Sequence, residues 1–514
     1  MVATASMVSG ATFVSRILGY VRDMIIARGF GAGSAADAFF VAFRIPNMAR
    51  ELLGEGALSA AFIPVFSETL AKRGRPSAFR LAATAFWTVA LILVGTCAIG
   101  IWIAPGLVQL IAPGFAREPE KLLLTIGLTR TMFPYLFFIG LTALMMGVLN
   151  SLGHFAAPAF SPALLNMSII LSVLFLGPHL EAPVYALAYG VLAGGCLQLL
   201  LQFIPAVRHG VSLMQTGEWR DPALARIGRL MGPGVAGLAI TQLNIFVTTL
   251  LASFLVEGSV SYLYYAFRLV HLPIGLIGVA VATVVFPTMA AAAARHSAED
   301  VRNTLVFALR ITFFLTLPAL LGLAIFRDFI IQLLFQRGEF TQAMTTATAQ
   351  VLLGYCIGLC FFVANRVVVP AFHAFQDTAT PVKAGAISVA GNIFFCLLLM
   401  GPFGAAGLAV ATSLAAVLNF FALMFFLRKH LGALPRRVLA KSLQKTGFAG
   451  LCMAGTLVTL QIVLPPMEGV GLFGEVARFV GEFGLGTAVF VGVSVLLGCD
   501  EVQVLRGLFH RWSA

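Results

Sequence analysis

Charged side chains interrupt the first two apolar stretches of the chain, where such residues are costly. At about 100° per residue, five residues of stretch 5–30 fall within an arc of roughly 120° and form a polar stripe; they are Ser15, Arg16, Gly19, Arg22 and Asp23. In stretch 36–70 one side holds Asp37, Arg44, Asn47, Glu51 and Glu55, and Arg50 lies off it. A guanidinium stays ionised and can form two hydrogen bonds to one phosphate, so the pattern predicts binding of an anionic group.

Positive charge exceeds negative charge within the apolar stretches. Seven arginines stand against four acidic residues; they are Arg16, Arg22, Arg28, Arg44, Arg50, Arg268 and Arg366 against Asp23, Asp37, Glu51 and Glu55. A charge at the bilayer centre costs about 2.5–3.5 kcal/mol unless it faces water or a partner, so the surplus predicts a cationic cavity. The alternative is that Arg16, Arg22 and Arg50 pair with Asp23, Asp37 and Glu55 and only hold helices together, which leaves the surplus unexplained.

The composition places these residues in a membrane protein. Only 11% of the 514 residues are charged and 60% are hydrophobic, whereas a soluble domain has about 25% charged residues. This scarcity of charge excludes a cytosolic enzyme, a disordered protein and a nucleic-acid binder, despite the net charge of +12. The N-terminus lacks a basic region followed by a short apolar region and a cleavage site, so we expect no removable signal peptide.

The stretches long enough to cross a bilayer, which takes about 20 apolar residues, predict an all-α membrane protein with 14 transmembrane helices. With both termini in the cytoplasm, 20 Lys and Arg residues fall in junctions on the cytoplasmic side, as the positive-inside rule requires. The junctions on the opposite side hold 5, which are Arg117, Lys121, Arg327, Arg337 and Arg478. The stretches are 5–30, 36–70, 79–112, 122–150, 158–177, 183–206, 224–255, 260–292, 303–325, 342–374, 380–400, 404–427, 441–464 and 474–498. Turn-rich or charged segments break most of them apart, for example at Gly177-Pro178 and Gly401-Pro402.

Short segments recur at an offset of about 224 residues. Ala42-Phe43-Arg44-Ile45 reappears as Ala266-Phe267-Arg268-Leu269, and Gly177-Pro178 as Gly401-Pro402. We therefore expect two six-helix halves, 1–222 and 223–435, followed by two extra helices in 436–514. An even number of spans makes the halves parallel repeats, and transporters of this construction usually bind cargo between their halves.

Motifs for catalysis, metal binding or ATP hydrolysis are absent from the sequence. There is no GxxxxGK[ST] loop, no HExxH motif and no CxxC pair among the seven cysteines. We therefore expect no enzyme activity, no metal and no cofactor. The energy for transport would come from an ion gradient, the membrane potential or the cargo gradient.

The stretch from Ser15 to Pro64, SRILGYVRDMIIARGFGAGSAADAFFVAFRIPNMARELLGEGALSAAFIP, resembles the N-terminal signature of the MurJ (MviN) lipid II flippase family. The resemblance continues through YYAFR at 264–268 and QDTATPVK at 376–383. This family belongs to the superfamily of multidrug, oligosaccharidyl-lipid and polysaccharide exporters. The resemblance implies transport of lipid II, an undecaprenyl-pyrophosphate-linked peptidoglycan precursor, from the inner to the outer leaflet of the bacterial inner membrane. We expect this transport to proceed by alternating access, with the two halves rocking against each other.

The resemblance also implies site residues. The cavity positions of the family fall on Arg16, Arg22, Arg50, Arg268, Asp37, Asn47 and Glu55, and its last two helices form a groove for the lipid tail. Two positions depart from some family members. Phe267 stands where they carry an acidic residue, and the seventh span offers Gln242, Asn244 and threonines in place of a sodium-binding acid, so we do not expect a sodium site.

The expected partners are lipid II and the bilayer, with the protein acting as a monomer and binding no nucleic acid. Three other functions remain to be weighed. A polysaccharide-lipid flippase shares the preference for an anionic headgroup but usually has fewer spans, and a drug/cation antiporter would need a net acidic cavity. A membrane glycosyltransferase would need a catalytic carboxylate and a sizeable extramembrane loop.

Overall fold

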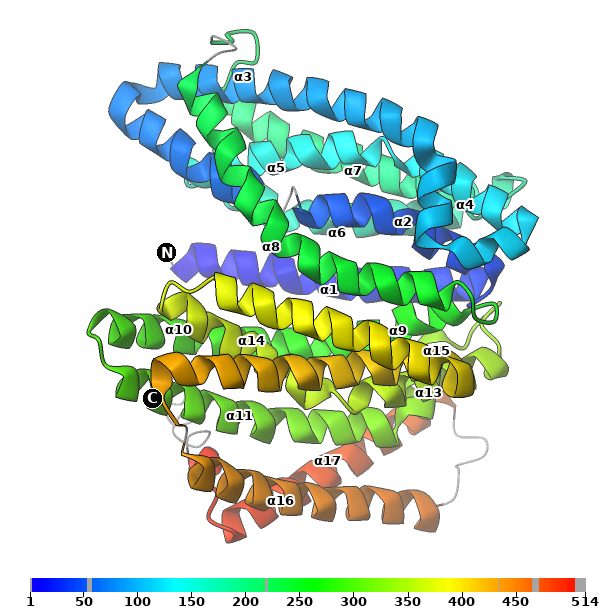
Figure 1. Ribbon diagram of the computed structural model, residues 1–514. Coiled ribbons are helices and arrows are strands. Elements are labelled where there is room, and N and C mark those ends of the chain that lie inside the picture. Colours follow the sequence, from blue (N-terminus) through cyan, green and yellow to red (C-terminus); the bar gives the residue numbers. More distant parts are fainter. Residues whose placement is uncertain (1, 53–57, 218–220, 434, 465–470, 504–514) are drawn as a thin grey trace. The chain divides into compact units, whose positions relative to one another are not determined.

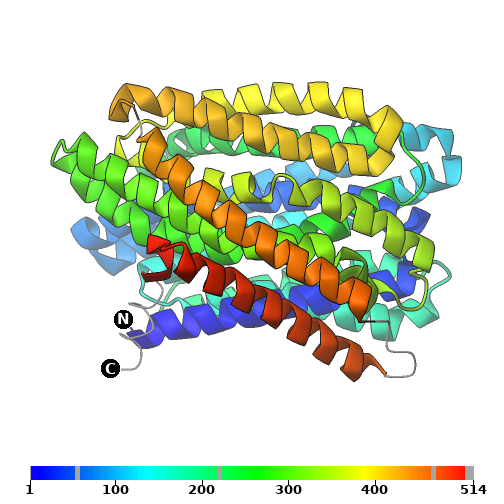
Figure 2. The same ribbon diagram turned by 90° about the horizontal axis from the view of Figure 1, so that it is seen from below.

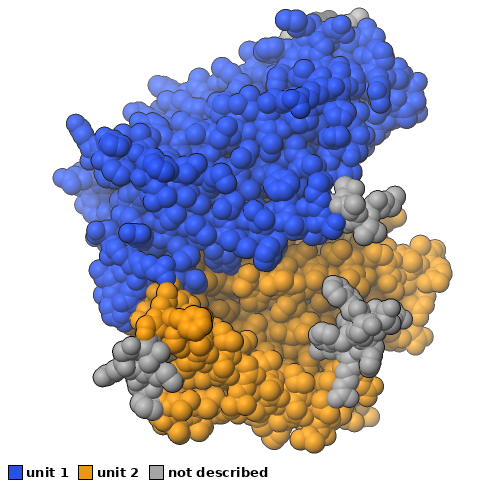
Figure 3. Space-filling model, turned by 180° about the vertical axis from the view of Figure 1, so that it is seen from behind, with its two compact units in different colours: residues 1–262, 334–344 blue, residues 263–333, 345–514 orange. Residues whose placement is uncertain are grey.

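The computed structural model describes residues 2–52, 58–217, 221–433, 435–464 and 471–503, and the regular elements in these ranges are all helices (Figure 1). Two compact units make up the chain: residues 1–262 with 334–344 (unit 1), and residues 263–333 with 345–514 (unit 2) (Figure 3). The predicted all-α class is confirmed. The predicted division at residues 222 and 435 stays a prediction, because a repeat boundary and a compact unit are different properties.

Unit 1 is a bundle in which neighbouring helices pack in a chain of pairs. Helix α1 packs on α6, α6 on α7, α7 on α5, α5 on α3 and α3 on α8. Small side chains allow close approach, since a Cβ on Gly190 would meet the backbone of α6 at Ile169. The helices are α1 Val2–Phe30, α2 Ser34–Leu52, α3 Leu58–Ile111, α4 Pro119–Met132, α5 Tyr135–Ser151, α6 Ala156–Leu171, α7 Tyr185–Arg208 and α8 Pro222–Ala252, and α9 Ser259–Pro273 begins in this unit.

Unit 2 surrounds α14, which packs against α10, α11 and α15. Its core includes Met289, Leu305, Val367, Phe372 and Leu423, each nearly or fully buried. The helices of unit 2, besides the rest of α9, are α10 Val279–Ala294, α11 Ala298–Ile325, α12 Arg327–Phe335, α13 Gln342–Cys356, α14 Leu359–Ala374, α15 Ala379–Leu431, α16 Arg436–Val463 and α17 Leu472–Leu496.

Nine helices of the described chain are long and apolar enough to cross a membrane, or ten if the bent pair α13–α14 counts as one span. Two of these stretches, Ala61–Ile111 and Ala379–Leu431, have 51 and 53 residues. At 1.5 Å per residue each has a contour of about 75–80 Å, against about 30 Å for the apolar core of a bilayer. Neither long helix is therefore a single straight crossing.

Each long helix turns at one glycine. Gly74 has φ 77° and ψ 174°, and Gly404 has φ 54° and ψ −132°, so both lie in backbone regions that essentially only glycine adopts. The predicted break at Gly401-Pro402 is displaced, because both residues are helical and the turn comes at Gly404. Glycine at this position divides α15 into two arms.

The last two described helices form their own layer in unit 2. Helices α16 and α17 lie side by side, and α16 packs on α11 (Figures 1 and 2). Their shared core contains Phe314, Met453, Leu457 and Phe490. At the end of α17, Arg310 of α11 donates to Glu501 and Asp500, both at 2.7 Å, which ties the end of this pair to α11.

The two ends of α15 meet through one carboxylate. Asp377, in the loop before α15, accepts hydrogen bonds from the Thr380 hydroxyl at 2.6 Å and the Thr380 backbone N–H at 2.9 Å. His430 Nε2, near the other end of α15, lies 3.1 Å from Asp377 Oδ2, and its ring stacks on Phe375. The Thr380 hydroxyl and N–H, together with His430, lower the pKa of Asp377 to about 2.

We expect Gly404→Ala to destabilise the protein by about 1–3 kcal/mol, because alanine is strained at this backbone conformation. The space itself is open, since no heavy atom lies within 4 Å of an added Cβ. Thermal unfolding of the purified protein measures the effect. Gly455→Ala is the matched control, because Gly455 lies within α16 and also has open space. An equal response of both variants would contradict the assigned role of φ at Gly404.

We expect Asp377→Ala to lower stability by about 1 kcal/mol at pH 7, as for other lost caps. The folded-state pKa of Asp377 is about 2, below its ordinary value of 3.8. Ionisation therefore stabilises the fold fully above the ordinary value, and this stabilisation is lost as the pH falls toward 2. Unfolding measured from pH 6 to pH 2 should show the wild type and the variant converging. A constant difference would exclude this linkage.

Candidate functional site

The polar side of α1 is fixed on α6. Arg22 is only 8% exposed, and its Nε and Nη2 donate to Asp23 Oδ1 at 3.0 and 2.7 Å. Its Nη1 donates to Asn166 Oδ1 at 3.1 Å, and the Asn166 amide in turn donates to the Ser15 carbonyl at 3.0 Å. The guanidinium is therefore held in one orientation by groups on both helices.

Arg16 lies on the same helix in a different environment. Its side chain is exposed, and it makes no hydrogen bond or ion pair with any residue that the structure describes. Its charge is therefore available for an external anion, whereas the charge of Arg22 is partly balanced by Asp23. Two of the predicted site residues on α1 thus differ in environment: Arg22 is buried and held by hydrogen bonds, and Arg16 is exposed.

The polar side of α2 faces α8 within unit 1. Arg50 Nε donates to Asn47 Oδ1 at 3.2 Å, and the Asn47 amide donates to Glu51 Oε1 at 3.0 Å. Gln242 of α8 donates to the second oxygen of Glu51. Arg50, predicted to lie off the shared side, reaches Asn47 because residues three apart are neighbours on a helix. Glu55, the remaining predicted residue of this segment, lies outside the described residues.

Arg44 also reaches from α2 to α8. Its Nη2 donates to Thr249 Oγ1 at 3.2 Å, and Thr249 itself donates back to the Ile245 carbonyl of its own helix. Two arginines of α2 therefore donate to neutral oxygen acceptors, Thr249 and Asn47, which help to orient their guanidinium groups. Arg50 also lies 3.8 Å from Glu51 Oε1, so part of its charge is balanced.

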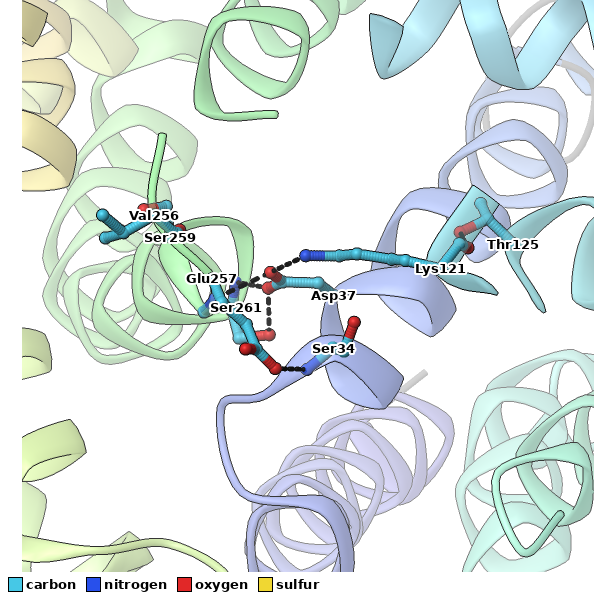
Figure 4. Close-up of polar contacts among 9 residues, drawn as sticks. Ser34, Asp37, Lys121, Thr125, Val256, Glu257, Ser259 and Ser261 are labelled. Carbon is cyan, nitrogen blue, oxygen red and sulfur yellow. Dashed lines mark hydrogen bonds and ion pairs between the residues drawn. The ribbon is translucent and has the colours of Figure 1, made fainter. Parts of the chain in front are cut away.

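Asp37, in the first turn of α2, is the most highly coordinated predicted residue (Figure 4). It is 1% exposed and forms a buried ion pair with Lys121 of α4, with 3.0 Å between Nζ and Oδ2. Its oxygens also accept from the Gly258 N–H at 2.8 Å, the Ser261 N–H at 2.9 Å and the Ser261 hydroxyl at 2.7 Å. These donors satisfy the carboxylate and make it the cap of α9.

The capping is reciprocal. Glu257, just before α9, accepts from the Ser34 N–H at the start of α2 at 2.5 Å (Figure 4). Each helix N-terminus therefore receives a carboxylate from the other segment, where the partial positive charge favours it. Asp37 and Ser261 are separated by 224 residues, the offset seen in the sequence repeat.

Two further close backbone contacts are also related by the repeat offset: Gly114 lies against Ser253, and Gly338 lies against Arg28. A Cβ on Gly114 would clash with the Ser253 carbonyl, and a Cβ on Gly338 would clash with the Arg28 carbonyl. The backbone is close here because the Glu339 N–H donates to the Arg28 carbonyl at 3.0 Å. Residue segment 334–344 is thereby joined to the end of α1 within unit 1.

Arg268 lies on α9 in unit 2, beside Phe267. Phe267 occupies the position where an acidic residue was noted in some family members. Its ring makes a T-shaped contact with His271 at 4.6 Å between centroids and tilts against Tyr355 at 5.0 Å. The neighbour of Arg268 is thus aromatic, and it adds no negative charge near the guanidinium.

The sequence did not point to several partners of these groups. Lys121 was counted among the charges of a junction, yet it is 4% exposed and paired with Asp37. Asn166 gave no signal because single polar residues are common in apolar helices. Ser261 had one signal, its position one repeat offset after Asp37. Within the described ranges no group of three His, Cys, Asp or Glu could hold a metal ion.

The chain resembles known proteins over most of its length. Residues 26–473 match the family model described as lipid II flippase MurJ. A probable lipid II flippase MurJ of Vibrio cholerae is 35% identical over 500 residues, covering 96% of this chain and 95% of its own. The lipid II flippase MurJ of Burkholderia cenocepacia is 37% identical over 432 residues, covering 82% of this chain and 83% of its own.

Solved structures agree with this relationship. The lipid II flippase MurJ in an inward closed conformation has a TM-score of 0.78 and 26% identity, covering 94% of this chain and 98% of its own. An inward-facing multidrug resistance transporter of the MATE family, in the MOP superfamily, has a TM-score of 0.68 at 16% identity over 81% of this chain and 95% of its own, which shows a shared fold alone. Since the family model spans nearly the whole chain and relatives align end to end, this chain belongs to the lipid II flippase MurJ family.

Proposed function

We propose that this protein moves lipid II from the inner to the outer leaflet of the bacterial cytoplasmic membrane, for peptidoglycan synthesis. The observation that carries the proposal is membership of the lipid II flippase MurJ family over nearly the whole chain. The protein is a transporter rather than an enzyme, and it is a multi-pass protein of the inner membrane. Its apolar helices and the oriented arginines on α1 and α2 fit an anionic lipid cargo.

We further propose fourteen membrane crossings with cytoplasmic termini. Helices α1, α6, α7, α8, α11, α16 and α17 each cross once. Four crossings combine consecutive helices: α2 with the first arm of α3, α4 with α5, α9 with α10, and α13 with α14. The second arm of α3 and the two arms of α15 complete the set, and the turns at Gly74 and Gly404 support this division.

The halves 1–222 and 223–435 are proposed as parallel repeats, with 436–514 as an addition. Contacts between positions one repeat offset apart support this division. In a two-fold arrangement equivalent residues meet only near the axis, as Asp37 and Ser261 do. Reciprocal contacts at Gly114 and Gly338 fit the same axis.

For the cargo, we propose that Arg16, Arg22, Arg50 and Arg268 bind the pyrophosphate. Arg22 and Arg50 are pre-oriented by Asn166 and Asn47, which reduces the cost of ordering them on binding. Asp37, Asn47 and Glu55 complete the proposed set. Asp37 acts by fixing the starts of α2 and α9, the two helices that carry Arg50 and Arg268.

The lipid tail would lie along α16 and α17. Both helices expose large apolar side chains, including Leu451, Ile462 and Phe473 at 72%, 77% and 88%. Exposed apolar faces of this kind suit a polyprenyl chain that stays in the bilayer while the headgroup crosses.

Alternating access can be driven without a cofactor. The membrane potential is negative inside and favours outward movement of anionic cargo by about 2.3 kcal/mol per net charge per 100 mV. We propose no sodium site, since the side-chain amide of Gln242 in α8 already donates a hydrogen bond to Glu51. We propose that one copy of the chain is sufficient for transport.

We expect Arg268→Ala to reduce flipping by about tenfold or more, because a hydrogen bond to a charged group contributes about 1.5–3 kcal/mol. Arg268→Lys should retain part of the activity, since it keeps the charge but loses the planar fork. The measurement is accessibility of the lipid II headgroup outside the cell at matched protein levels. Arg302→Ala, which removes a charge paired with Glu299 near the start of α11, is the control. Undiminished flipping by Arg268→Ala would remove Arg268 from the site.

We expect polyprenyl-pyrophosphate lipids bearing sugar and peptide to co-purify with the wild-type protein. Native mass spectrometry in mild detergent identifies them by mass. Their amount should fall in a variant combining Arg16→Ala with Arg268→Ala. Recovery of polyprenyl lipids that carry only polysaccharide would instead indicate a polysaccharide-lipid flippase.

A further inference from the structure

One face of α14 stays open although the helix lies inside unit 2. Its buried side chains recur in pairs along the opposite side, from Leu359 and Cys360 to Ala371 and Phe372. At 100° per residue, the open face contains Phe362, Arg366 and His373 within about 40° of one another. Arg366 and His373 are exposed, and Phe362 is half-buried.

Arg366 is a charged residue in the middle of this face. Within the described chain it makes no hydrogen bond or ion pair. Its stem packs over Gly278, where an added Cβ would lie 3.3 Å from Arg366 Cβ and 3.5 Å from its Cγ. Gly278 closes a π-helical turn at Ile274–Gly278, an irregularity that often marks functional sites. The glycine holds the stem close to the backbone and leaves the guanidinium exposed.

The open face differs from the faces that suit lipid. On α15, the exposed residues Phe394, Leu397 and Leu398, at 63%, 60% and 60%, are all apolar. The face of α14 instead combines an arginine and a histidine with one aromatic ring. An exposed arginine without a protein partner inside a span is stable where it faces water. The contrast therefore indicates a hydrated face on α14.

The open face of α14 lies close to the part of α9 that carries Arg268. The ring of Phe362 lies 6.2 Å from that of Phe267, the residue next to Arg268, and both belong to unit 2. Arg366 lies eight residues before the end of α14 at Ala374, about 12 Å along the helix axis. In the proposed topology that end is cytoplasmic, so Arg366 lies between the cytoplasm and Arg268.

We propose that Arg366 is a second anion-binding residue of unit 2, which contacts the pyrophosphate of the cargo on its way from the cytoplasm to Arg268. The proposal rests on the proposed function and adds a binding position to it. Arg366 suits this purpose because its charge is uncompensated and its planar fork fits a phosphate. His373, nearer the end of α14, extends the same hydrated face.

The first experiment tests hydration of the face. Arg366→Cys and Leu397→Cys proteins in lipid nanodiscs are treated with a charged, membrane-impermeant thiol reagent, and mass spectrometry counts labels against the wild type. We expect one additional label on Arg366→Cys and none on Leu397→Cys. No additional label on Arg366→Cys would mean that the face contacts lipid, which would overturn the proposal.

The second experiment measures binding of farnesyl pyrophosphate to the purified full-length protein. We expect Arg366→Ala to weaken binding by about ten- to a hundredfold, with Arg366→Lys in between. Arg295→Ala, an exposed arginine after α10, should bind as the wild type does. Inorganic pyrophosphate as a competitor separates headgroup recognition from tail binding, and displacement of the probe supports the former.

Two outcomes separate the inference from the function on which it rests. If Arg268→Ala loses binding and Arg366→Ala does not, Arg366 is no anion site and the proposed function stands. If neither variant differs from the wild type, both the proposed function of these arginines and the inference are contradicted. A melting temperature for each variant shows whether a loss of binding reflects a loss of folding.

Discussion

An ionised side chain in the apolar core of a membrane must be paired or hydrated, and this constraint sorts the charges of the protein. Asp37 and Lys121 satisfy it by pairing, since both are almost fully buried and bonded to each other. Arg16 and Arg366 do not pair within the described chain and lie exposed. The first kind of charge joins helices, and the second kind keeps an exposed charge that we propose binds the anionic cargo.

The predicted alternative, in which the arginines only pair and hold helices together, describes some of these charges and not others, and anion binding by the remaining arginines stays a prediction. Arg22 pairs with Asp23 of its own helix and reaches α6 through Asn166, and Lys121 of α4 pairs with Asp37 of α2, a pair that the predicted pairing did not include. Arg50 is oriented mainly by Asn47, with Glu51 at 3.8 Å, rather than by Glu55. Asp23 and Asp37 are already paired within unit 1. They therefore do not neutralise the exposed Arg16.

Sequence patterns predicted the features that depend on a single segment. The predicted apolar stretches lie on helices of the structure, and the helical spacing placed Arg22 within the polar stripe of α1. Features that need a second segment were beyond such patterns: Lys121 was assigned to a junction because its partner is 84 residues away. The turn of α15 was predicted at Gly401-Pro402 but occurs at Gly404, since a Gly-Pro pair can remain helical and only the backbone conformation distinguishes the glycines.

The hydrogen bonds between Asp37 and Ser261 join two positions that are one repeat offset apart. Such a contact restricts which residues the two proposed repeats can carry at these positions. Residues on a two-fold axis face their own counterparts, so a carboxylate kept in both copies would place like charges in contact. Here each copy retains one acid at a different position, Asp37 in one and Glu257 in the other, and each acid faces an N–H group. In the proposed two-fold arrangement, different residues at equivalent positions therefore avoid a contact between like charges near the axis.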